Sequence, residues 1–112
     1  MRFISTKAHG IMDYTVGTIL SVGPALLGPK YKTARKLLFA SGMAATIYSL
    51  FTNYELGAVK KLSMKTHLTL DVLSGLFLVA SPWLFVLNKE EKAPLMISGL
   101  VEIGAGLLSK TE

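Results

Sequence analysis

The sequence predicts an all-α fold, a bundle of four transmembrane helices. Of the 112 residues, 51% are hydrophobic and 17% are charged, whereas soluble domains carry about a quarter charged residues. The charges also gather in short clusters, which leave four nearly uncharged stretches between them. A helix needs about 20 residues to cross the ~30 Å of hydrocarbon in a bilayer, so each stretch predicts one transmembrane helix.

The four stretches follow one another with basic residues between them. The first, 8–29, contains a single charged residue, Asp13, and the second, 37–54, contains none. The third, 66–88, contains only Asp71, and the fourth, 93–109, contains only Glu102. Buried helices of a soluble bundle would show polar faces, and segments such as LFLVASPWLFVL have none. We therefore expect a single membrane domain that covers residues 1–112.

Composition also excludes several classes of protein. The chain has no cysteine, so it offers no disulfide, thiolate nucleophile or iron–sulfur ligand. Its net charge of +5 comes from clusters that suit lipid headgroups, and no basic stripe of the kind that binds nucleic acid is visible. Six basic residues fall on each side of the predicted bundle, so the distribution of positive charge does not set its orientation.

The chain is predicted to be a duplicated helical hairpin. Residues 5–27 align with 63–85 without a gap and share eight identities, where chance would supply about two. The predicted repeats are 5–54 and 63–112, joined by a linker at 55–62. Both copies enter the membrane from the same side, which makes the repeat parallel. The identities include Gly17/Gly75, which we expect to let the first and third helices approach closely at the axis between the repeats.

One tripeptide in the second repeat supports a family resemblance. Ser81-Pro82-Trp83 follows HLTLDVLSGLFLVA, and the first repeat has Gly23-Pro24-Ala25 at the matching place. The chain resembles the SPW-repeat family of small prokaryotic integral membrane proteins over nearly its whole length, including the linker residues Tyr54-Glu55-Leu56-Gly57. The resemblance implies a duplicated two-helix unit and a multi-pass location in the cytoplasmic membrane. It brings no catalytic residues.

The tripeptide also has a direct physical interpretation. Pro82 lacks an amide hydrogen, so it is expected to bend or end the third helix, with Ser81 bonding to the carbonyl that the proline leaves free. Pro24 is expected to act likewise in the first repeat. Trp83 lies where the third helix meets the headgroups, a depth at which indole rings concentrate. We expect these residues to form a helix bend and an interface anchor.

The motifs HGIMD and HLTLD place a histidine and an aspartate four residues apart in each repeat. His9, Asp13, His67 and Asp71 would lie in the first turns of the first and third helices and meet at one end of the bundle. In one interpretation they bond to one another and fix the packing of the hairpins. In a second they bind zinc, iron or manganese. In a third, His9 and His67 are the axial ligands of a b-type haem.

Glu102 is the candidate mid-membrane carboxylate, because it lies near the middle of the fourth helix. Ionisable groups at this depth are costly, which favours a role in proton or small-ion translocation. The alternative is a neutral Glu102 that bonds to Tyr48 or Ser41.

These features rank three functional classes. A membrane scaffold or interaction protein, which needs no cofactor, comes ahead of a metal- or haem-binding protein, and both come ahead of a transporter. The chain has no GxSxG, P-loop, GxGxxG or HExxH motif, so an enzyme is not the favoured class. The lipid bilayer is the expected partner, and the small residues of the fourth helix also suit a homodimer.

Overall fold

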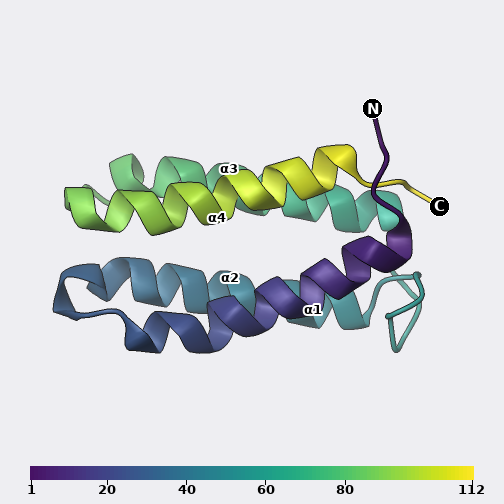
Figure 1. Ribbon diagram of the computed structural model, residues 1–112, viewed down its shortest axis with the longest axis horizontal. Coiled ribbons are helices and arrows are strands. Elements are labelled where there is room, and N and C mark those ends of the chain that lie inside the picture. The colour runs from purple at the N-terminus through teal and green to yellow at the C-terminus, as the bar shows by residue number, and fades with distance from the viewer.

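The structure, a computed structural model, describes residues 1–112 and consists of four α-helices without a β-strand (Figure 1). The helices are α1 Thr6–Val22, α2 Lys32–Leu50, α3 Met64–Leu84 and α4 Lys89–Leu108. Two short 3-10 helices, η1 Gly23–Leu26 and η2 Pro29–Tyr31, join α1 to α2. The all-α fold class is confirmed.

The helices form two hairpins that lie side by side. The α1–α2 hairpin falls in the range 5–54, and the α3–α4 hairpin falls in the range 63–112. Both chain termini and the segment that joins α2 to α3 lie at one end of the bundle, and the turn of each hairpin lies at the other end (Figure 1). The molecule is elongated, with extents of 40 × 26 × 19 Å.

Local hydrogen bonds set the starts of the helices. Ser5 and Ser63 are the N-caps of α1 and α3, and each side chain accepts a hydrogen bond of 3.1 Å from a backbone amide three residues later. The start of α2 is capped from the other hairpin, because Ala34 N donates to Glu91 Oε2 at 2.7 Å. These contacts supply acceptors for amides that a helix leaves free in its first turn.

The expected bond near Pro82 is present. Ser81 Oγ donates to the carbonyl of Leu78 at 2.7 Å, the carbonyl that the proline leaves without a backbone donor, and α3 ends two residues after the proline. Trp83 is 59% exposed at this end, with Lys92 Nζ lying 5.3 Å from its ring centroid. Pro24 lies in η1, directly after the end of α1.

Gly17 and Gly75 lie at close helix contacts, although not at the expected one. A Cβ atom on Gly75 would lie 2.5 Å from the carbonyl oxygen of Gly99, and one on Gly42 would lie 3.0 Å from that of Gly17. These glycines therefore bring together the two helices of each hairpin. The prediction that Gly17 and Gly75 join α1 to α3 was wrong, because each glycine faces the neighbouring helix of its own hairpin.

Only one helix has the length and composition of a membrane span, α3 Met64–Leu84. The prediction of four such spans is thus not supported by helix length and composition. α1 has only 17 residues. α2 and α4 each begin with charged residues, which lie outside the uncharged stretches of the sequence.

Burial in the bundle is unusual for so apolar a chain. Of the 25 buried residues, only eight are hydrophobic, whereas nine are polar or charged. The largest apolar cluster contains Leu20, Ala34, Leu38, Leu78 and Leu95. Many large hydrophobic side chains lie on the outer surface instead. Examples, each between 45% and 57% exposed, are Ile19, Phe39, Phe77 and Leu100.

Candidate metal centre

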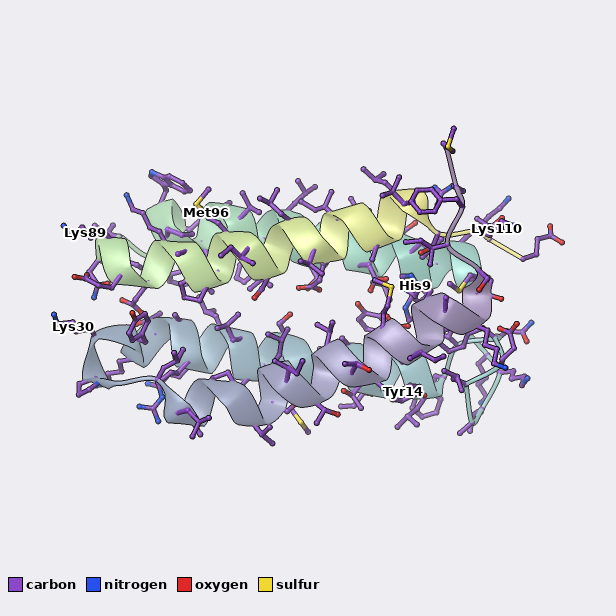
Figure 2. All side chains as sticks on the ribbon, in the orientation of Figure 1. His9, Tyr14, Lys30, Lys89, Met96 and Lys110 are labelled. Carbon is purple, nitrogen blue, oxygen red and sulfur yellow. The ribbon has the colours of Figure 1, made fainter.

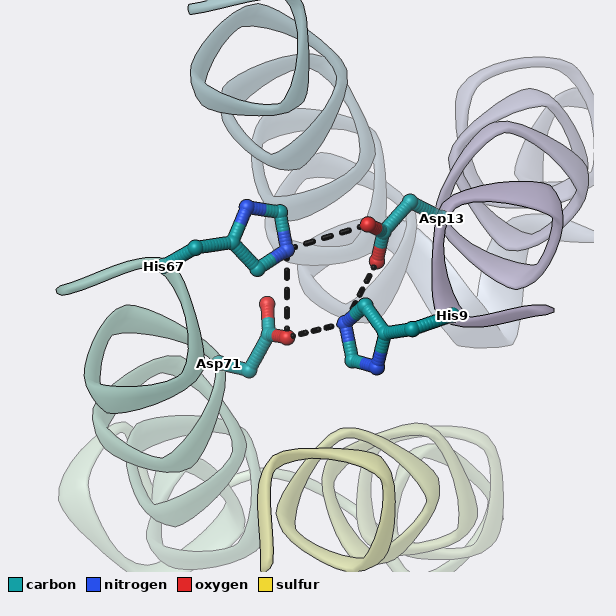
Figure 3. Close-up of side chains that lie close together, drawn as sticks. All are labelled: His9, Asp13, His67 and Asp71. Atoms are coloured by element: carbon teal, nitrogen blue, oxygen red, sulfur yellow. Dashed lines mark hydrogen bonds and ion pairs between the residues drawn. The ribbon is translucent and has the colours of Figure 1, made fainter. Parts of the chain in front are cut away.

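Two histidines and two aspartates form a closed ring between the hairpins (Figure 3). His9 Nε2 lies 3.1 Å from Asp13 Oδ1 and 2.8 Å from Asp71 Oδ2. His67 Nε2 lies 3.0 Å from Asp13 Oδ2 and 3.4 Å from Asp71 Oδ2. Each imidazole thus contacts both carboxylates, and we call these four residues the His/Asp ring. The structure brings together all four residues that the two motifs single out.

The helices explain why these side chains converge. Residues four apart lie on one face of a helix, so α1 presents His9 and Asp13 together, and α3 presents His67 and Asp71 together. The ring lies near the end of the bundle that holds the chain termini, and His9 is directed toward the space between the hairpins (Figure 2). Both histidine side chains are fully buried, and the aspartate side chains are 10% and 7% exposed.

Two short backbone bridges bring hydroxyl groups to the far side of each imidazole. Ile4 pairs with Ser109, and Thr52 pairs with Leu62. Ser109 Oγ consequently lies 2.6 Å from His9 Nδ1, and Thr52 Oγ1 lies 2.7 Å from His67 Nδ1. The end of α4 therefore supports the histidine of α1, and the end of α2 supports that of α3.

The hydrogen bonds of Thr52 determine which nitrogen of His67 carries a proton. Its hydroxyl donates to the carbonyl of Tyr48 at 2.6 Å, so the single hydroxyl hydrogen is used there. Thr52 Oγ1 must then accept from His67 Nδ1, which places a proton on Nδ1 and points Nε2 into the ring. His67 Nε2 has no hydrogen-bond partner with good geometry among the protein atoms, although two carboxylates lie close by.

Two phenols hold the carboxylates from outside the ring. Tyr54 Oη donates to Asp13 Oδ2 at 2.7 Å, and Tyr48 Oη donates to Asp71 Oδ1. Every member of the His/Asp ring therefore has one hydroxyl partner: Ser109, Thr52, Tyr48 or Tyr54. These four roles were not predicted from the sequence. Only Thr52 and Ser109 could have been paired from it, because they are 57 residues apart, the same offset that relates the similar segments 41–50 and 98–107.

The ring is electrostatically balanced without any other cation. Two protonated imidazoles offset two carboxylates, so the buried group carries no net charge in that state. Such an ion pair is tolerated inside a protein only when its remaining donors and acceptors are satisfied. The four hydroxyl groups bond to the outer atoms of the ring, and His67 Nε2 is the one atom left without a well-aligned hydrogen bond. Two imidazole nitrogens and two carboxylates are also a donor set that divalent transition metals accept.

Glu102 lies outside the ring, on α4, and is 8% exposed. Its Oε2 lies 3.4 Å from Ser41 Oγ, a long hydrogen bond, and its Oε1 has no partner among the protein atoms. Tyr48, the other predicted partner of Glu102, bonds to Asp71 instead.

The linker is attached to the start of α1, beside the ring. Tyr14 Oη donates to the carbonyl of Leu56 at 2.8 Å, and Thr6 Oγ1 donates to Glu55 at 2.8 Å. Hydrogen bonds from its own backbone amide and from Thr6 hold the pKa of Glu55 below its ordinary value. The linker is thus fixed directly after Tyr54, the residue that bonds to Asp13.

Fold and site together define a class: a pair of helical hairpins joined by a buried His/Asp ring with the donor set of a metal centre. Comparisons with protein-family models, with curated proteins and with solved structures found no match. The resemblance to the SPW-repeat family therefore stays a prediction.

Proposed function

We propose that this chain is a small helical membrane protein whose His/Asp ring binds one divalent metal ion, with zinc the best fit. The observation that carries the proposal is the convergence of two imidazole nitrogens and two carboxylates from two helices. All four donor atoms lie within 4.8 Å of one another.

The spacing of the donors supports a bound divalent ion. Donors bound at roughly 2.0–2.1 Å to a tetrahedral zinc ion lie about 3.3 Å apart. The nitrogen–oxygen pairs of the ring are separated by 2.8 to 3.4 Å, with Asp13 offering a different oxygen to each histidine, and one donor atom from each residue lies within 4.8 Å of the others. The more widely separated donors would have to approach one another for all four to hold an ion, in exchange for the two Nε2 protons.

The surroundings of the ring support the same proposal. Metal-binding histidines commonly donate their second ring N–H to an oxygen acceptor, which fixes the ring and its tautomer. His67 does so through Thr52, and its Nε2 has no well-aligned hydrogen bond to lose. His9 has Ser109 at the equivalent nitrogen. Hydrogen bonds from Tyr54 and Tyr48 orient the two carboxylates.

The surface supports a bilayer location with four crossing helices. A polar interior inside an apolar exterior is what a lipid-facing bundle requires, since large exposed apolar areas are rare on soluble monomers. The 40 Å length of the bundle exceeds the ~30 Å hydrocarbon core. Lys30 and Lys89 lie at one end and Lys110 at the other (Figure 2), where headgroups would be. The cytoplasmic membrane of a prokaryote and a homodimer stay predictions.

The other interpretations have less support from the geometry. A haem between His9 and His67 would need the space that the carboxylates fill, and the cavity beside them measures only about 30 Å³. An ion path through Glu102 would have to cross the apolar cluster around Leu20 and Leu78 in the other half of the bundle. The scaffold role needs no metal, and the ring supports it too, because its ion pairs join the two hairpins.

Equilibrium dialysis against Zn²⁺ in mild detergent tests the metal proposal. We expect about one Zn²⁺ per chain, with binding weakened by two orders of magnitude or more, on the order of 3 kcal/mol, in His67→Gln and in Asp71→Asn. Glu112→Gln, which removes an exposed carboxylate after α4, is the matched control and should bind as the wild type does. Equal binding by all four proteins would contradict the proposal.

Cysteine labelling tests the membrane proposal, because the chain has no cysteine of its own. Single cysteines at exposed apolar positions such as Phe77 and Leu100 should resist a water-soluble maleimide in proteoliposomes. Cysteines in place of Lys30, in η2, and of Glu55, in the linker, should react once the membrane is permeabilised. Rapid labelling at Phe77 and Leu100 would contradict a lipid-facing surface.

A further inference from the structure

Glu102 is the buried carboxylate that the ring does not use. Its Oε1 is buried and has no hydrogen-bond partner among the protein atoms, and no basic side chain forms an ion pair with it. Buried polar atoms nearly always have a partner, either in the protein or in ordered water. The hydrogen bond from Ser41 Oγ to Oε2 is long, and no protein group donates a hydrogen bond to Oε1. Glu102 therefore requires a further partner.

A partly open cavity borders both Glu102 and the ring. It measures about 30 Å³ and is lined by Glu102 together with the ring residues Asp13 and Asp71. A water molecule needs roughly 10–15 Å³ of such space and two to four polar partners, so the cavity suits one or two waters. The rest of the lining is apolar and includes Ala45 and Ala105, whose small side chains leave the space open.

We propose that this cavity holds a water molecule that donates a hydrogen bond to Glu102 and serves as an additional ligand of a metal bound in the His/Asp ring. The inference rests on the proposed metal-binding function. It makes the centre an open one, with four protein donors and one exogenous oxygen, where a structural zinc site would be closed by its protein ligands alone.

The position of the cavity determines what the additional ligand can be. The carboxylates of Asp13 and Asp71 border the cavity, and the two imidazoles do not line it. A ligand in the cavity would therefore approach the metal beside the two carboxylates. Such a ligand would also lie beside the carboxylate of Glu102. The favoured ligand is therefore a hydrogen-bond donor such as water, because the carboxylates would repel an anion.

Glu102 is then a positioning residue, since it acts on the metal through the water. A metal ion makes its bound water a stronger hydrogen-bond donor, and Glu102, which lines the cavity and has an unpartnered oxygen, would be the acceptor. In the other hairpin Ala45 occupies the equivalent place, 57 residues earlier, so Glu102 is the one lining carboxylate that lies outside the ring. The site thus has room for one exogenous ligand on one side.

The absorption spectrum of the Co²⁺-loaded full chain in mild detergent tests the inference. Four-coordinate Co²⁺ absorbs several-fold more strongly in its d–d bands than five-coordinate Co²⁺, so intensity per bound ion reports coordination number. We expect weak, five-coordinate bands in the wild type. Ala45→Leu, which fills the cavity from α2, and Glu102→Leu, which removes the acceptor, should each raise the intensity several-fold with Co²⁺ still bound.

The control is Ala44→Leu, which adds the same side chain at the neighbouring exposed position and should leave the spectrum unchanged. Strong four-coordinate bands in the wild type, or equal spectra in all four proteins, would overturn the inference and leave the metal-binding function standing. Failure of the folded wild type to bind Co²⁺ would overturn both. If Ala45→Leu does not fold, Glu102→Leu alone decides the outcome.

Discussion

His67 of α3 lies with its Nε2 3.0 Å from Asp13 Oδ2 of α1, although 54 residues separate the two in the chain. The pair joins the hairpins across the bundle, and His9 with Asp71 repeats the contact in the opposite sense at 2.8 Å. Both contacts join residues that are far apart in the chain, so they can form only when the two hairpins pack together.

Removing one member of the ring should destabilise the folded state strongly. Asp71→Asn leaves two protonated imidazoles facing a single carboxylate in a buried site. Breaking a buried ion pair in this way costs about 3–5 kcal/mol in free energy of unfolding. Unfolding by SDS titration from mild detergent measures the difference. Glu112→Gln is the control, with a change of about 0.5 kcal/mol or less, and a similarly small loss for Asp71→Asn would show that the ring is not a stabilising link.

Tyr48→Phe should weaken metal binding without removing a metal ligand. The substitution deletes the phenol that orients Asp71, and loss of such an outer partner typically lowers metal affinity by about 10- to 100-fold. Competition dialysis with a chelator of known affinity measures the change. Tyr31→Phe, in η2 at the other end of the bundle, should leave the affinity as it is. Equal losses in both variants would indicate a general effect on the fold.

Two glycines of the α3–α4 hairpin should respond in opposite directions to alanine. The Cβ of Gly75→Ala would lie 2.5 Å from the carbonyl oxygen of Gly99, so the helices must separate, at a cost of about 1–3 kcal/mol in stability. Gly104→Ala meets nothing within 4 Å and should raise stability by up to about 1 kcal/mol, because alanine favours the helix. The two free energies of unfolding check the prediction. A gain in stability for Gly75→Ala would contradict the close contact.

Ser81 and Pro82 should be coupled in a double-mutant cycle. Ser81→Ala leaves the buried carbonyl of Leu78 without a donor and should cost about 1–3 kcal/mol. In a Pro82→Ala background the restored backbone N–H can bond to that carbonyl, so the same change should cost clearly less. Unfolding free energies of the four proteins give the coupling. Additive effects would show that Ser81 does not compensate for the proline.

The sequence predicted the ring better than its surroundings. The four-residue spacing of each motif places His9 with Asp13, and His67 with Asp71, on single helix faces, so their convergence needs only that α1 and α3 both face the interior. Thr52 and Ser109 lie at helix ends, where the path of the chain depends on the bridges to Leu62 and Ile4. Such long-range pairing leaves no periodic pattern in the sequence.

The packing partners of the glycines were missed for a similar reason. Gly17 and Gly75 share a face with the ring residues in the sequence pattern, and a helix in a four-helix bundle has two neighbours on its inner side. Which of these neighbours a small residue contacts depends on the tilt of each hairpin. The pattern predicted that Gly17 and Gly75 pack closely, while their partners, Gly42 and Gly99, required the structure.

The metal content of the protein as purified from membranes in mild detergent tests the central claim most directly. Elemental analysis should find about one equivalent of zinc per chain in the wild type, retained in Glu112→Gln and absent from the double variant His9→Gln/His67→Gln. A folded wild-type protein that is free of metal, and that takes up neither Zn²⁺ nor Co²⁺ when these are added, would contradict the claim and leave the His/Asp ring as a link between hairpins.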